Sequence, residues 1–67
     1  MIEVVLNGET HLLPQSTSVV AALMLWGYRC EQIAVAINGE FVARTEYGTK
    51  VLSARDLVDV VAPMQGG

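Results

Sequence analysis

The fold is set by a stretch near the amino terminus, residues 2–13, which reads IEVVLNGETHLL. Every second residue of Ile2–Leu6 is a branched apolar residue, and this period of two is typical of a strand. Asn7-Gly8 is the strongest short hairpin signal, because both central residues of a type I′ turn need a positive φ. The stretch therefore predicts two antiparallel strands, the second running over Glu9–Leu13 and ending before Pro14.

A helix is predicted to follow this hairpin. Thr17 or Ser18 is a suitable N-cap, since a hydroxyl can accept a hydrogen bond from a free N–H of the first turn. Gly27 fits the position just past the last helical residue. Four apolar residues at helical spacing form one stripe that faces a core: Val19, Ala22, Leu23 and Trp26.

The second half of the chain contains three further strand candidates. Ile33–Ile37 is a short apolar run, and Asn38-Gly39 supplies a second hairpin turn to Glu40–Val42, an expected edge strand. Arg44–Leu52 shows no clear period, so we expect one helical turn and a loop there. Leu57–Ala62 is predicted to be the last strand.

This order predicts an α+β fold with a mixed sheet of four or five strands, covered on one face by one main helix. In the last strand, Val58 and Val60 are expected to face inward and Asp59 outward. The first and last strands are both strongly apolar, so we expect them side by side at the sheet centre and parallel. This is the β-grasp arrangement of ubiquitin-like proteins. One domain is expected over 1–67, with 63–67 as a flexible C-terminal tail.

Composition narrows the function classes. The chain has 67 residues, of which 52% are hydrophobic, and a net charge of −3. Its four basic residues are dispersed, whereas a nucleic-acid binder is expected to carry a basic stripe. The longest apolar run, Val19–Trp26, is far shorter than the ~20 residues of a membrane span. We see no export signal, and so expect a cytoplasmic protein too small for a deep catalytic cleft.

The pair Gly66-Gly67 is the strongest functional signal. Without side chains, these residues can pass through a channel only as wide as the backbone, and they can bend where other residues would clash. The preceding residues, 62–65, carry no charge and read as a short projecting arm. We therefore expect the carboxylate of Gly67 to be the working group. Met64 and Gln65 are expected to be gripped by a partner, although they could also serve only as a spacer.

A family resemblance is carried, in order along the chain, by Val35-Ala36-Ile37-Asn38-Gly39-Glu40, Val42-Ala43-Arg44, Tyr47, Val51-Leu52, Asp56-Leu57-Val58-Asp59-Val60-Val61 and Gln65-Gly66-Gly67. Through these residues the chain resembles the ThiS family, the sulfur carriers of the thiamine pathway, over essentially its whole length. It departs from the family pattern at Ala43, where proline is usual, and at Arg55-Asp56, where a Gly-Asp turn is usual.

The resemblance implies a carrier and not an enzyme. A ubiquitin-activating-type, ThiF-like adenylyltransferase would use ATP and Mg²⁺ to convert the Gly67 carboxylate into an acyl adenylate. A persulfide from a cysteine desulfurase would then displace AMP and leave a thiocarboxylate. A ThiG-like thiazole synthase would take that sulfur. The chain itself is expected to bind no cofactor or metal, and Met64, Gln65 and Gly66 would be the recognised tail.

Other functions fit the same features. The small subunit of molybdopterin synthase shares the expected fold and ending, as do carriers for cysteine or tRNA thiolation. A modifier that conjugates to lysines uses the same activation. A non-covalent β-grasp module that binds a ligand or RNA is a different class. Cys30 and His11 cannot build a metal site by themselves, so we expect a passive thiol and a structural histidine.

Overall fold

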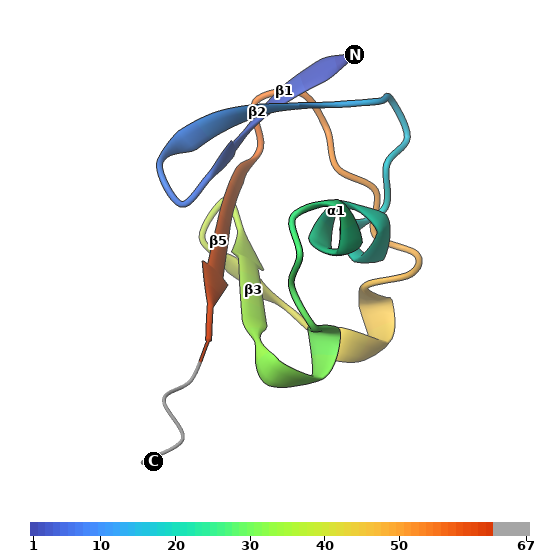
Figure 1. The fold of residues 1–67 in the computed structure, drawn as a ribbon, viewed down its shortest axis with the longest axis vertical. Coiled ribbons are helices and arrows are strands. Elements are labelled where there is room, and N and C mark those ends of the chain that lie inside the picture. Colours follow the sequence, from blue (N-terminus) through green and yellow to red (C-terminus); the bar gives the residue numbers. More distant parts are fainter. Residues whose placement is uncertain (63–67) are drawn as a thin grey trace.

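A computed structural model of the chain describes residues 1–62, and its sheet confirms the predicted α+β, β-grasp fold. Five strands lie in the order β2-β1-β5-β3-β4, and the helix α1 covers one face of the sheet (Figure 1). The elements in chain order are β1 Ile2–Leu6, β2 Glu9–Leu13, α1 Val19–Leu25, the 3₁₀ turn η1 Cys30–Gln32, β3 Ala34–Ile37, β4 Glu40–Val42, the 3₁₀ turn η2 Arg44–Glu46 and β5 Leu57–Val61.

The first and last strands are adjacent and parallel at the centre of the sheet, as predicted. Val5 of β1 lies opposite Leu57 of β5, and Leu6 lies opposite Val58. β3 flanks β5 on its other side and is antiparallel to it. The outer strands β2 and β4 each pair with their hairpin neighbour. The strand that leads into the C-terminal segment is therefore an interior strand with a neighbour on each side.

Both hairpin turns have the predicted backbone. The φ values of Asn7 and Gly8 are 48° and 88°, and those of Asn38 and Gly39 are 53° and 84°. Two consecutive positive φ angles are what a type I′ turn requires, and asparagine followed by glycine adopts them with little strain. Each turn sets the register of the strand pair that it joins.

The helix begins and ends where the sequence predicts. The Ser18 side chain is the N-cap and accepts a hydrogen bond from the Ala21 amide at 3.2 Å. Thr17, the other candidate, instead donates its hydroxyl proton to the Pro14 carbonyl at 2.6 Å. The C-cap is Trp26, and Gly27 follows with a φ of 84°. No helix within residues 1–62 has the length and hydrophobicity to cross a bilayer.

The core lies between α1 and the sheet. Three of the four predicted stripe residues of the helix are buried in this core. The fourth, Trp26, is only half-buried and lies at the margin of the core. There its ring packs edge-on against the His11 ring, with 5.6 Å between the two ring centroids. In β5 the predicted alternation holds, with Val58 and Val60 buried and Asp59 exposed. The buried apolar residues are Val4, Leu6, Leu13, Val19, Ala22, Leu23, Ile33, Val35, Ile37, Val42, Tyr47, Leu52, Val58 and Val60.

The segment between α1 and β3 contains a short element that the sequence did not reveal. Cys30–Gln32 forms a single 3₁₀ turn, whereas only the helical turn within Arg44–Leu52 was predicted and is present as η2. The guanidinium of Arg44 donates to the Glu31 carbonyl at 3.3 Å and so joins the two turns. This long-range contact has no signature in the local sequence of the segment.

Candidate functional site

The described chain ends at Ala62, directly after β5, at the end of the molecule away from the amino terminus (Figure 1). The predicted site residues Met64, Gln65, Gly66 and Gly67 lie outside the described residues. What the structure supplies is the surface from which that segment leaves. This root of the C-terminal segment comprises the end of β5 and the surfaces on either side of it.

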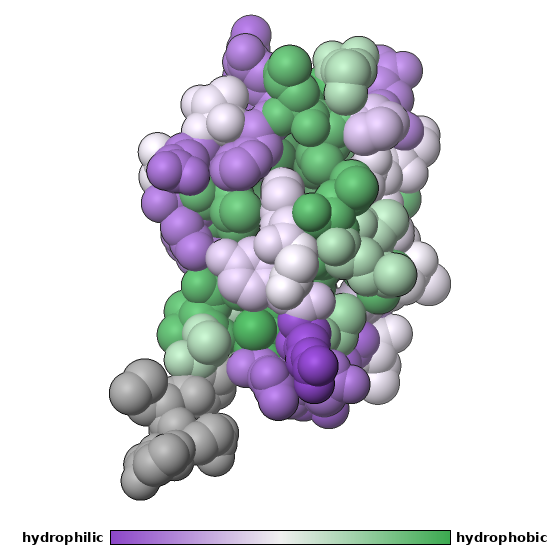
Figure 2. Space-filling model, viewed as in Figure 1, coloured by the Kyte–Doolittle hydropathy of each residue, from purple (hydrophilic) through white to green (hydrophobic). Residues whose placement is uncertain are grey.

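The face of the sheet that α1 leaves uncovered is largely apolar. Phe41, Val61 and Leu57 point outward and are 74%, 59% and 52% exposed. They lie opposite or beside smaller apolar residues of the neighbouring strands. Figure 2 shows hydrophobic surface at the end of β5. We call this set the apolar sheet face: Val5, Leu12, Ala34, Ala36, Phe41, Leu57 and Val61.

Acidic side chains interrupt the apolar sheet face. Asp59 lies on it between Leu57 and Val61, and Glu3 lies on β1 opposite Leu12. Large exposed apolar residues with a polar rim are typical of surfaces that bind another protein. The arrangement fits a protein partner with an apolar contact area and basic groups near it.

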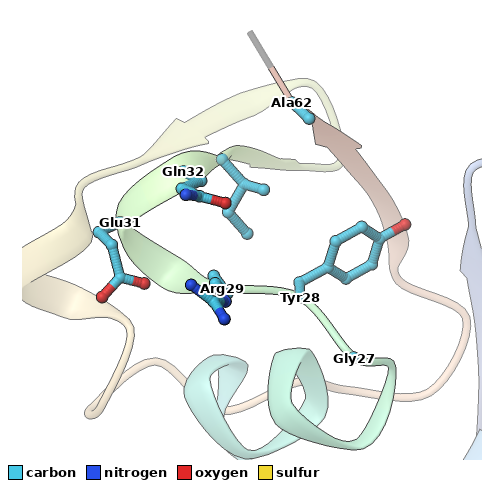
Figure 3. Close-up of a pocket in the computed structure, with 7 residues that line it drawn as sticks. Gly27, Tyr28, Arg29, Glu31, Gln32 and Ala62 are labelled. Atoms are coloured by element: carbon cyan, nitrogen blue, oxygen red, sulfur yellow. The ribbon is translucent and has the colours of Figure 1, made fainter.

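A shallow hollow of about 520 Å³ lies on the other side of the root. Figure 3 shows Ala62 across this hollow from Tyr28 and Arg29. The segment between α1 and β3 forms most of its wall, so one side of it is set by η1. The lining residues are Gly27, Tyr28, Arg29, Glu31, Gln32, Ile33 and Ala62. Arg29, an exposed residue, thus lines the same hollow as Ala62, the last described residue of the chain.

Cys30 and His11 are the two side chains that were predicted to be a passive thiol and a structural histidine. Cys30 is a half-buried free thiol in η1. His11 is about one-third exposed, packs against Trp26, and has its Nε2 3.7 Å from the Glu9 carboxylate. Within residues 1–62, no three His, Cys, Asp or Glu side chains gather closely enough to hold a metal ion.

Tyr47 is the described residue whose pKa is shifted by its surroundings. Burial raises the pKa of its hydroxyl above the ordinary 10.0, and the nearby Cys30 thiol raises it further, with Arg44 acting in the opposite direction. Tyr47 is buried and lies in the core beneath η2. The hydroxyl is therefore neutral at pH 7, and Tyr47 belongs to the hydrophobic core.

The apolar sheet face was not predicted, although the sequence contains a signal for it. The last strand, LVDVV, is apolar on both faces apart from Asp59, yet a single helix can cover only one face of the sheet. Leu57 and Val61 therefore had to be either exposed or covered by something else. The hollow had no comparable signal, because its wall depends on how η1 packs.

Three comparisons place this geometry among known proteins. The model of the ThiS family matches residues 2–67. A crystal structure of a thiamine biosynthesis protein (ThiS) from Geobacter metallireducens superposes with a TM-score of 0.83 at 25% identity, covering 98% of this chain and 100% of that one. An NMR structure of a thiamine biosynthesis protein from the same organism gives 0.80 at 23% identity, covering 98% and 88%, and shows the fold alone.

A curated relative is described as a thiazole synthase from Magnetococcus marinus. It is 39% identical over 62 residues, which make up 92% of this chain but only 19% of the relative. The chain therefore spans about a fifth of the length of the relative that it matches. In that protein, a segment similar to this chain shares one polypeptide with a much larger remainder.

Proposed function

Since the chain belongs to the ThiS family, we propose that it is a sulfur carrier for building the thiazole ring of thiamine. The observation that supports this most directly is the extent of the family match, which runs through the closing Gly66-Gly67. The likeness to a thiazole synthase and to solved thiamine biosynthesis proteins favours this route over molybdopterin synthesis.

The proposed chemistry takes place at the carboxylate of Gly67. An α-carboxyl group with a pKa of about 3.5 is ionised at pH 7 and is a poor electrophile. An oxygen of the carboxylate attacks the α-phosphorus of ATP and releases pyrophosphate, which gives an acyl adenylate. The activating partner supplies the Mg²⁺ and the cationic groups that neutralise the phosphates.

Sulfur enters in the second step. The terminal sulfur of a persulfide attacks the adenylated carbonyl carbon and expels AMP. A thiol of the donor then cleaves the sulfur–sulfur bond, which forms a disulfide on the donor and leaves a thiocarboxylate on Gly67. No side chain of the carrier takes part, and this accounts for a chain that is proposed to be a co-substrate and not an enzyme.

The carrier's own contribution is binding and presentation. We propose that the apolar sheet face contacts the activating adenylyltransferase, because that face includes the outward side chains of β5, the strand that leads directly to Ala62. Val61 is the last residue of β5 and lies on this face, so a partner bound there is close to the start of the tail. Met64, Gln65 and Gly66 would enter the partner's channel, and Gly67 would reach the reaction centre.

The final acceptor is proposed to be a thiazole synthase. The relative from Magnetococcus marinus supports this, because a segment similar to this chain is covalently joined to that activity. Joining two components of one reaction raises their effective concentration, to about the mM range for a short flexible linker. Where the carrier and the synthase are separate chains, binding between them would bring the thiocarboxylate to the synthase.

Intact-mass spectrometry tests the proposal. The purified chain is incubated with a ThiF-like adenylyltransferase, ATP, Mg²⁺ and a persulfide donor, and we expect the mass change of one oxygen-to-sulfur exchange at Gly67. A chain lacking Gly67 is the matched control; it should not be charged, and its thermal unfolding should match that of the full chain. A full chain that stays uncharged would refute the proposal. Intact mass of the protein from its natural host should also give a chain ending at Gly67.

A further inference from the structure

The C-terminal end of β5 is bonded to Asn7, the residue that follows β1. In the parallel pairing of β1 with β5, Val5 lies opposite Leu57 and Leu6 lies opposite Val58. After Leu6 the chain turns away from β5 at Asn7-Gly8. The backbone of Asn7 still donates to the Val58 carbonyl at 2.9 Å. Beyond that point, β1 offers no backbone group to β5.

Beyond Val58, the side chain of Asn7 makes the hydrogen bonds to β5 that the β1 backbone does not make. Its Oδ1 accepts a hydrogen bond from the Val60 amide at 2.8 Å, and its Nδ2 donates to the Val60 carbonyl at 3.3 Å. A carboxamide presents one acceptor and one donor in the same way as a peptide group. The side chain therefore adds one more rung to the sheet, two residues before Ala62.

We propose that Asn7 is a positioning residue that fixes the direction in which the C-terminal segment leaves the body. β3 holds the other flank of β5 as far as Val61, which pairs with Ala34. With Asn7 in place, Val60 is bonded on its β1 side as well. Without it, the last rung on that side is lost, and the strand end is held only by β3.

The direction of β5 at Val60 affects which positions the proposed reactive group can reach. Five residues follow Ala62, and in extended form they span about 17 Å. If a partner's channel holds those residues extended, a change of roughly 20° at the root would move the tip by about 6 Å over that length. Since displacements of about 1 Å can cost a factor of about 100 in rate, small changes at Val60 matter at Gly67.

The second hairpin offers a matched control. Asn38 occupies the same turn position and holds the start of β5: its Oδ1 accepts from the Leu57 amide at 3.0 Å, and its Nδ2 donates to the Asp56 carboxylate at 3.0 Å. Each of the variants Asn7→Gly and Asn38→Gly removes two side-chain hydrogen bonds. Each also leaves a Gly-Gly turn, which tolerates positive φ. They differ in how far the lost contact is from the tail.

The inference rests on the proposed function, so the test has two readouts. The first is amide hydrogen exchange in the uncharged chain, where Asn7→Gly should speed the exchange of Val60 by at least about tenfold and Asn38→Gly should leave it within about twofold. The second is charging by the adenylyltransferase as a function of carrier concentration. There Asn7→Gly should lower kcat about tenfold and leave KM within about twofold, because the apolar sheet face is unchanged.

Equal losses of kcat in the two variants, measured below both melting temperatures, would overturn the proposal, since they would show a general effect of stability. Unchanged exchange at Val60 in Asn7→Gly would overturn it as well, as would faster exchange with normal charging. A wild-type chain that takes up no sulfur would refute the proposed function instead. The exchange of Val60 would then still decide whether Asn7 holds the strand end.

Discussion

Phe41 provides the sharpest test of the apolar sheet face. It lies on the edge strand β4 opposite Ala36, points away from the core and is 74% exposed. Because only about a quarter of it is buried in the free chain, Phe41→Ala should lower the free energy of unfolding by less than about 1 kcal/mol. Any larger effect should appear when a partner covers the side chain.

The size of that effect follows from the exposed area. A phenylalanine side chain buries about 200 Å² at most, so about 150 Å² remains to be covered by a partner. At ~25 cal/mol per Å², full burial would contribute about 3.7 kcal/mol as an upper bound. Allowing for incomplete burial, we expect a loss of about 2 kcal/mol, which is about a 30-fold weaker Kd.

Met24 is the matched control, because it is 70% exposed but lies on α1, across the core from the apolar sheet face. Isothermal titration calorimetry of each variant with the adenylyltransferase, without ATP, measures binding apart from chemistry. Phe41→Ala should bind about 30-fold more weakly and Met24→Ala within about twofold of wild type. Unchanged binding of Phe41→Ala, or an equal loss in both variants, would refute the assignment of this face.

Three further predictions concern the body that carries the tail. Leu23 is fully buried, so Leu23→Ala should cost about 2–5 kcal/mol of unfolding free energy in urea denaturation; a loss under about 1 kcal/mol would contradict its place in the core. The folded pKa of Tyr47 lies above its unfolded value of 10.0, so its contribution to stability is complete below pH 10 and is lost as the pH rises through the folded pKa. Thermal melts should show that Tyr47→Phe declines less than wild type above pH 10, and equal declines would count against burial as the cause. Ser18 caps α1 through the Ala21 amide, so Ser18→Ala should cost about 1 kcal/mol, whereas Ser18→Asp should restore most of it by the same melts.

The sequence predicted those parts of the fold that depend on neighbouring residues. Asn7-Gly8 and Asn38-Gly39 specify turns with two positive φ angles, and each turn dictates how its two strands pair. Ser18 and Gly27 mark the helix ends because caps act within one turn of the chain. The central parallel pair was also predictable, since the first and last strands are both strongly apolar and such strands belong in the interior of the sheet.

The functional tail was predicted from composition alone. The chemistry proposed for Gly66-Gly67 involves only the backbone and its carboxylate, so the residue types suffice to suggest it and no packing is needed. Those residues lie outside the described part of the chain, and their role stays a prediction that the charging experiment decides. The surface around the root could be predicted only in part, from the two-faced hydrophobicity of residues 57–61.

Contacts between residues far apart in the chain were decided only by the tertiary structure. Asn7 reaches Val60 across 53 positions, and Arg44 reaches Glu31 across 13. The turn propensity of Asn7 is a local property, but its second use as a rung for β5 exists only because the strand order places β1 beside β5. Local preferences act over a few bonds and can be read along the chain, whereas these contacts form when burial of the common core brings the strands together.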